Sequence, residues 1–167
     1  MVNAFLFLRR IRHCAGFGVQ SPTDYAFVRG VIYERLPYYA YEELKTDYPN
    51  ADKRMMWQAR LLHRISNYAQ TDDLVFCSSK MPEIYAAAIK KGCKRTRIQQ
   101  CCDDDHISLY ADKNGTWFIV PDIHRGNKSL WHLLTSHTSI IAFDLYYLGV
   151  AFVDRKRFAE THIINPY

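Results

Sequence analysis

Short apolar runs alternate with helix signals in the second half of the chain, and this alternation limits the possible folds more than any other feature. Residues 73–77 form an apolar run typical of a buried strand, and the alanine-rich stretch 82–91 predicts a helix that Gly92 closes from a C′ position. Further strands are expected over 96–102, 116–120, 139–144, 149–153 and 161–165, with a short helix over 128–136. Strand–helix–strand order of this kind predicts an α/β domain with a mostly parallel sheet.

The last three predicted strands follow one another without full helices between them. Residues 146–149 and 154–160 are the only connections that separate these strands. Antiparallel neighbours need only short connections, whereas parallel neighbours need a longer crossover. We therefore expect these strands to pair antiparallel at the C-terminal edge of the sheet.

The first half of the chain carries helical spacing of its apolar residues instead. This spacing predicts helices over 3–13, 21–36 and 53–69, with Ser21 as an N-cap and Pro22 in the first turn. We expect an N-terminal helical extension, residues 1–50, packed on an α/β domain of residues 51–167. The tyrosines between positions 25 and 48 are interpreted mainly as core between these parts, although tyrosine also lines pockets and partner surfaces.

Composition and charge exclude several classes of protein. The 167 residues are 49% hydrophobic, which excludes a disordered chain, and no apolar stretch is long enough to predict a transmembrane helix. The net charge of +5 aids solubility without indicating nucleic-acid binding by itself. Five irregularly spaced cysteines do not form a disulfide pattern, so we expect a soluble, cytoplasmic protein in a reducing compartment, with no membrane contact.

Two segments resemble a known enzyme family. The C-terminal segment contains Pro121-Asp-Ile-His124, then Trp131, the strand ending in Asp144-Leu, a Gly149-led apolar strand, and His162-Ile-Ile; the N-terminal segment contains Gly16-Phe-Gly-Val-Gln-Ser-Pro22 followed by Tyr38-Tyr39. Together they resemble a group of class I S-adenosylmethionine-dependent methyltransferases common in Bacteroidota. The resemblance implies a Rossmann-like sheet with an N-terminal helical extension.

The middle of the chain departs from that family where the cofactor would bind. The family binds S-adenosylmethionine in a glycine-rich turn after the first strand, since backbone must approach the ligand closely there. Here the strand ends in Phe76, where the family has an acid, and the turn 78–82 contains no glycine and ends in Pro82. The residues left as cofactor-binding candidates are Ser78, Ser79, Lys80 and the ribose-contacting acid Asp103.

The sheet is also expected to be shortened. Only residues 103–116 separate the second predicted strand from the third, where the family has a further strand and helix. Loss of the cofactor turn favours a non-catalytic, degenerate methyltransferase-like protein without a cofactor, which acts by binding a protein partner or as a homodimer. A shared fold does not imply a shared function when the residues of the binding site are lost.

Two other functions stay open. A methyltransferase with an atypical cofactor loop would use Asp122, His124 and Asp144 as catalytic candidates, because they follow strands at the usual ligand-binding edge. The competing interpretation is that Asp122 caps a turn, His124 packs locally and Asp144 fixes the turn 146–149. A small nucleic-acid-binding module would use the basic run Lys90–Arg97, which also suits a helix end and a solvated turn.

No metal site is expected. Cys93, Cys101, Cys102 and His106 lack a Cys-x-x-Cys pair, and adjacent cysteines in a strand point to opposite faces of the sheet. The acidic run 103–105 could supply oxygen ligands to a divalent ion, but consecutive loop aspartates are more often solvated.

Overall fold

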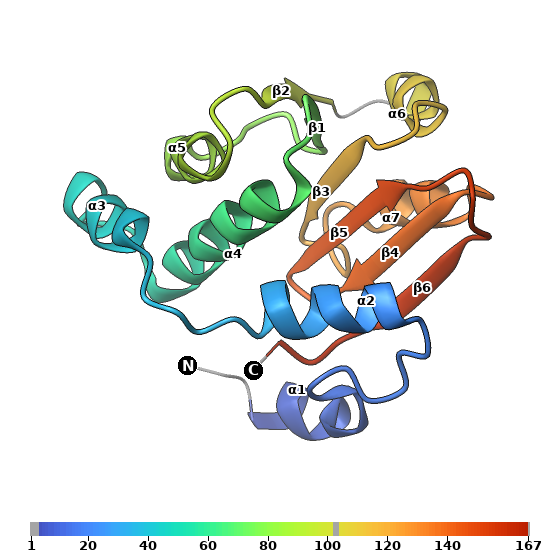
Figure 1. The fold of residues 1–167 in the computed structure, drawn as a ribbon, viewed down its shortest axis with the longest axis horizontal. Coiled ribbons are helices and arrows are strands. Elements are labelled where there is room, and N and C mark those ends of the chain that lie inside the picture. The colour runs from blue at the N-terminus through green and yellow to red at the C-terminus, as the bar shows by residue number, and fades with distance from the viewer. Residues whose placement is uncertain (1–3, 102–103, 167) are drawn as a thin grey trace.

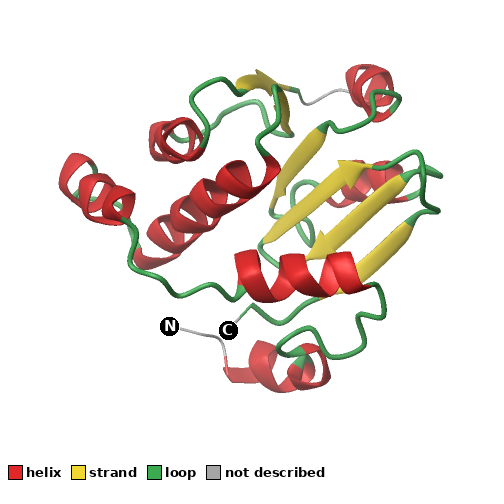
Figure 2. Cartoon of the chain, in the orientation of Figure 1, coloured by secondary structure: helices red, strands yellow, loops and turns green. Residues whose placement is uncertain are grey.

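The computed structural model describes residues 4–101 and 104–166, and in it one sheet carries helices on both faces (Figures 1 and 2). The described strands are β1 (Asp73–Phe76), β2 (Arg97–Gln100), β3 (Trp117–Pro121), β4 (Ile140–Asp144), β5 (Leu148–Val153) and β6 (Glu160–Ile163). The described helices are α1 (Ala4–Arg9), α2 (Pro22–Phe27), α3 (Tyr39–Asp47), α4 (Lys53–Ala69), α5 (Glu83–Gly92), α6 (Asp104–Ala111) and α7 (Lys128–Thr135), with a 3₁₀ turn at Ile11–His13 and a π-helical turn at Val28–Ile32. The predicted α/β class is therefore confirmed.

The six strands lie in the order β2-β1-β3-β5-β4-β6. β1 pairs in parallel with both β2 and β3, while β5 pairs antiparallel with β3 and with β4. The predicted β4–β5 hairpin is present, but the antiparallel strand lies inside the sheet. β6 also differs from the expectation, because it pairs in parallel with β4 (Asp144 opposite Ile163) on the side away from β5. The short connection between β5 and β6 therefore crosses β4.

Two apolar clusters sandwich the sheet. One cluster joins α2, α4 and α5 to one face, where Phe27 of α2 packs its ring 4.8 Å from Phe143 and 5.6 Å from Trp117. The other joins α6 and α7 to the opposite face, around Phe118 and Trp131. Figure 1 shows α2 lying across β4, β5 and β6, with α7 behind the same strands.

Local signals account for the best-placed helices. α4 covers the predicted range 53–69, and the Asp52 carboxylate caps it by accepting a 2.8 Å bond from the Met55 amide. Ser21 caps α2 in the same way, with Pro22 in the first turn. α6 is unexpected, since the sequence predicts only a connection over 103–116. Its buried residues Ile107 and Ala111 pack this helix against the sheet.

Gly92 has a different role from the predicted one. It is the last residue of α5 and does not adopt a left-handed conformation. A Cβ atom there would lie 2.4 Å from the carbonyl oxygen of His63 and 3.0 Å from the amide nitrogen of Asn67, both in α4. Gly92 is therefore needed for the close packing of α5 on α4, which the Ser66 hydroxyl reinforces by donating a 2.8 Å bond to the Ile89 carbonyl.

A buried ionic cluster fastens α2 to the loop between β5 and β6. The carboxylate of Asp24, whose side chain is 2% exposed, accepts bonds from both terminal nitrogens of Arg157. The His162 ring nitrogen Nε2 lies 3.0 Å from the same carboxylate. Burial alone would raise the pKa of Asp24, but the hydrogen bonds and charges of Arg157 and His162 hold it well below its usual range. Asp24 is thus a buried carboxylate that depends on its partners.

None of the helices in the described part of the chain combines the length and the apolar character needed to cross a membrane.

Candidate functional site

The strand order places a candidate ligand crevice between β1 and β3. The chain leaves β1 towards β2 on one side and later returns to pair β3 on the other side of β1. α5, which follows β1, lies on one face of the sheet and α7, which follows β3, lies on the other, so the two connections diverge at the carboxyl ends of β1 and β3. Ligands of open α/β sheets bind at such a reversal of strand order.

A cavity of about 220 Å³ lies at this position and brings together part of the predicted site. Ser78, Lys80 and Asp122 line it, so three of the candidates meet there. Ser79 does not line the cavity, and Asp103 lies outside the described residues. The remaining lining is supplied by Asp52, Arg54, Met55, Gln58, Phe76, Pro82, Tyr85, Pro121 and Asn127. The volume is below the roughly 300–1,000 Å³ usual for sites of drug-sized ligands.

Large side chains occupy the floor of the crevice. Phe76, the last residue of β1, is 1% exposed and stands where the methyltransferase group that the sequence resembles has an acid. Its ring packs 6.1 Å from that of Tyr85 on α5, and the Tyr85 hydroxyl donates a 2.5 Å bond to the side-chain oxygen of Gln58 on α4. Burial raises the pKa of Tyr85 to about 12, so this hydroxyl stays a neutral donor. The bond between Tyr85 and Gln58 joins α5 to α4 along the lining of the crevice.

The Ser78 side chain forms its hydrogen bonds within the turn that follows β1. The Ser78 hydroxyl lies 3.5 Å from the Lys80 amide and 3.4 Å from the Lys80 carbonyl. Pro82 follows and has no amide donor. Met81 is half-buried against the apolar cluster that includes Phe76. The turn therefore offers few of the free backbone donors that a phosphate- or carboxylate-binding loop presents.

Asp122 caps the turn that follows β3. Its φ of 49° is left-handed, which is uncommon outside glycine. Its amide donates to the Tyr147 carbonyl at 2.9 Å, and its carbonyl accepts from the amides of Arg125 and Asn127. The Asn127 side chain closes the same turn by donating to the Pro121 carbonyl at 2.7 Å. These bonds use the backbone amide and carbonyl of Asp122, and Asp122 also lines the crevice.

His124 and Asp144 come together in a separate cluster with Arg10. The His124 nitrogen Nε2 lies 3.0 Å from Asp144 Oδ2 and 3.0 Å from Arg10 Nη2, and the His124 ring stacks on Tyr146 at 4.8 Å. Asp144 Oδ1 accepts from Arg10 at 2.8 Å and from the Tyr146 amide at 2.8 Å. Asp144 thus fixes the turn 146–149.

Arg10 makes this cluster a structural clamp. Its Nη1 donates to the carbonyls of Asp144 at 3.0 Å and Ile164 at 3.2 Å, and its side chain is only 10% exposed. A histidine that acts as a general base needs a ring nitrogen that can accept a proton from the substrate. In His124, Arg10 lies against the nitrogen Nε2. His124 and Asp144 join the N-terminal segment to the ends of β4 and β6, and neither lines the crevice.

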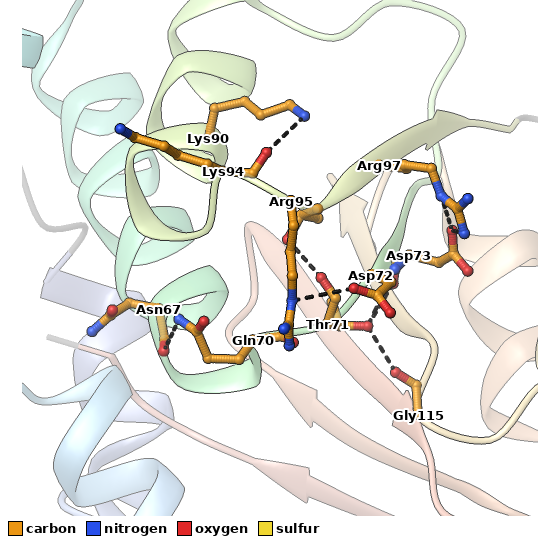
Figure 3. A network of polar contacts seen from close by, with 11 residues as sticks. Asn67, Gln70, Thr71, Asp72, Asp73, Lys90, Lys94, Arg95, Arg97 and Gly115 are labelled. Atoms are coloured by element: carbon orange, nitrogen blue, oxygen red, sulfur yellow. Dashed lines mark hydrogen bonds and ion pairs between the residues drawn. The ribbon is translucent and has the colours of Figure 1, made fainter.

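Three of the five cations in the basic run Lys90–Arg97 have acidic partners, and Figure 3 shows two of them, Arg95 and Arg97. Arg95 pairs with Asp72 at 3.2 Å, and Arg97 pairs with Asp73 at 2.9 Å. Lys91 pairs with the α3 acids Glu43 at 2.5 Å and Asp47 at 3.7 Å. The Lys90 ammonium donates to the carbonyl of Lys94. Nucleic acid would have to displace most of these partners to use the run.

The cysteines do not gather into a metal site within the described residues. Cys77, Cys93 and Cys101 are buried, and burial raises the pKa of the Cys77 thiol. One group with ligand geometry, Asp24, Glu160 and His162, has its donor atoms within 4.8 Å of one another. Arg157 already supplies the cation at that point, so a metal ion would meet a like charge.

Sequence reasoning missed Gln58 and Tyr85, which line the crevice. Each lies on a helix whose apolar spacing indicates only a face that packs against the core. The signal that could have found them is Phe76, since an aromatic residue at the end of β1 needs neighbours from the flanking helices. No family model, curated protein or solved structure matches the chain.

Proposed function

We propose that the chain is a shortened methyltransferase-like α/β domain that does not bind S-adenosylmethionine and acts by binding another molecule. The resemblance of the segments 121–153 and 16–22 to the methyltransferase group supports the family. The short connection between β2 and β3, residues 101–116, in which α6 is the one element among the described residues, supports the shortening.

The observation that carries the proposal is the filled crevice. At the carboxyl end of β1, buried Phe76 stands where the methyltransferase group has an acid, and the buried, hydrogen-bonded Tyr85 and Gln58 line the cavity beside it. The space that remains is about 220 Å³. A ligand would have to break that bond and move a core side chain, and both changes oppose binding.

One observation favours a second candidate, a methyltransferase with an atypical loop. Ser78, Lys80 and Asp122 line the same cavity and supply polar groups at the ligand-binding edge. This candidate requires Tyr85 to swing out when the cofactor enters.

A protein partner or a second copy of the chain could bind by adding a strand to an edge of the sheet. The edge strands are β2 and β6, of four residues each.

A thermal-shift experiment separates these candidates. With S-adenosylmethionine or S-adenosylhomocysteine at about 1 mM, we expect the Tm to change by less than about 1 °C. A site with a Kd of about 10 µM would stabilise the fold by about 2.7 kcal/mol and raise the Tm by about 5–10 °C. A rise of that size would support the atypical methyltransferase instead.

A further inference from the structure

A cavity larger than the crevice lies elsewhere in the molecule, between α4 and the linker that joins α2 to α3. Its volume is about 860 Å³, within the roughly 300–1,000 Å³ usual for small-ligand sites. Linker residues 32–38 line one side of it, and Trp57, Arg60 and Arg64 of α4 line the other. Figure 1 shows this linker leading from α2 to α3 past the start of α4. We call this cavity the arginine pocket.

The aromatic side chains around the arginine pocket pack on one another and on the core. The Tyr38 ring lies 5.3 Å from that of Tyr41 and 5.2 Å from that of His63, and the Tyr41 ring lies 5.6 Å from His63. Trp57 packs against the apolar core. These contacts fix the walls before any ligand binds, which lowers the cost of ordering the site. The polar groups of the lining therefore decide what the pocket can hold.

Arg64 is a buried cation whose described partners are all uncharged. The residue is 7% exposed and donates to the carbonyls of Val31 at 2.6 Å and Ile32 at 3.2 Å, and to the Tyr41 hydroxyl at 3.0 Å. The two carbonyls end the π-helical turn, and the partial negative charge of a helix end offsets only part of a full positive charge. Buried arginines are rare unless they are paired. These bonds use three of the five guanidinium donors, so donors remain for a ligand.

Arg60 lies one helical turn before Arg64 on the same side of α4, and one of its donors is unused. Its guanidinium carbon lies 5.1 Å from the centre of the Tyr41 ring. Its Nε is buried and has no hydrogen-bond partner within the described part of the chain. A buried donor of this kind is costly unless an acceptor from outside the chain reaches it. Among the described residues, neither arginine forms an ion pair.

The two acids of the lining do not neutralise these arginines. The Glu34 carboxylate accepts from the amides of Arg35 and Leu36 at 2.7 and 2.9 Å. Glu42 is exposed at the start of α3 and forms no ion pair with the part of the chain that the structure describes. With Arg35, the lining has three arginines against these two acids. The pocket thus holds two adjacent cations that lack a counterion from the described residues.

We infer that the arginine pocket binds a small phosphate monoester, with the phosphate group held by Arg60 and Arg64. The planar fork of a guanidinium matches the oxygens of a phosphate, and a monoester carries close to two negative charges at about pH 7, as two arginines require. The volume exceeds what a phosphate group alone needs, so an organic group accompanies it. The inference concerns a different site from the crevice and does not depend on the loss of S-adenosylmethionine binding, so each can fail alone.

The test is calorimetric titration of the full chain with phenyl phosphate, which joins a monoester phosphate to one small ring. We expect a Kd of about 0.1–1 mM at about 50 mM salt. Benzoate has the same ring and a single negative charge, and it should bind at least about fivefold more weakly.

Three variants show whether the heat comes from the arginine pocket. Arg60→Gln removes one of the two cations and should weaken binding about tenfold. Arg60→Lys keeps the charge without the planar fork and should weaken it about threefold, which gives a second measurement if Arg60→Gln folds poorly. Arg12→Gln makes the same charge change at an exposed position in the 3₁₀ turn Ile11–His13, outside the lining, and should leave the Kd within about twofold.

Four results would overturn the inference. They are no binding heat at about 10 mM phenyl phosphate, equal weakening in Arg60→Gln and Arg12→Gln, equal affinity for benzoate, and tighter binding of isophthalate than of phenyl phosphate. Isophthalate carries two carboxylates on one ring, so the last result would assign the arginine pocket to a dicarboxylate instead.

Discussion

Replacing Arg157 with alanine is expected to lower the free energy of unfolding by about 3–5 kcal/mol at about pH 7, measured by urea denaturation. The reason is the Asp24 carboxylate, which is 2% exposed and has both oxygens bonded to Arg157. Without the arginine, His162 is the one side chain among the described residues that still pairs with the buried carboxylate. The cost comes from that unpaired charge more than from the missing attraction.

The pH dependence of this difference identifies its cause. Because the pKa of Asp24 is held below its usual range in the folded protein, its stabilising contribution is complete above about pH 4 and is lost as the pH falls towards the folded pKa. In Arg157→Ala, burial dominates and should raise that pKa, so protonation relieves the penalty. The gap between variant and wild type should therefore narrow on acidification.

Two controls accompany Arg157→Ala. Lys156→Ala removes a positive charge from the adjacent exposed position and should change stability by less than about 0.5 kcal/mol. In an Asp24→Asn background, Arg157→Ala should cost clearly less, since no charge is left buried. A destabilisation below about 1 kcal/mol, or a gap that does not change with pH, would contradict the role assigned to this cluster.

Gly92→Ala is expected to cost about 3 kcal/mol, at the upper end of what an added buried methyl group usually costs. The new Cβ would stand 2.4 Å from the carbonyl oxygen of His63, and that atom belongs to helix backbone, which cannot rotate away. α5 would have to move off α4 and strain the bond from Ser66 to the Ile89 carbonyl. Urea denaturation again gives the measurement.

Gly30→Ala is the matched control. Gly30 lies in the π-helical turn Val28–Ile32, without a left-handed φ, and a Cβ there has no neighbour within 4 Å. The same substitution should be neutral or stabilise the protein by up to about 1 kcal/mol. If the two alanine variants had equal stability, the close helix contact at Gly92 would carry no energetic weight.

Sequence periodicity is sufficient where a local rule decides the structure. Helix α4 follows its apolar spacing and its Asp52 cap, and β1 follows from a continuous apolar run. Periodicity does not say which strands are neighbours, so it does not predict the parallel pairing of β6 with β4. Gly92 shows the same limit, because its neighbour His63 belongs to another helix.

The functional sites are predictable only in part for a similar reason. Asp122 is identified because strand ends in an α/β sheet converge, and Ser78 and Lys80 are identified because their turn corresponds to the cofactor turn of the family that the sequence resembles; the crevice does join the three. Arg10 and Arg157 escape prediction, since their partners lie more than 130 residues away in the sequence. The interpretation of the tyrosines before α4 as core holds for Tyr41, which is buried, but not for Tyr39, which is 93% exposed.

Calorimetric titration of the purified protein with S-adenosylhomocysteine, repeated with S-adenosylmethionine, tests the central claim most directly. We predict no binding heat with either ligand, because Phe76 stands where the proposed family has an acid and the cavity beside it is only about 220 Å³. Binding with a micromolar Kd would contradict the claim and show that a turn without glycine still holds the cofactor.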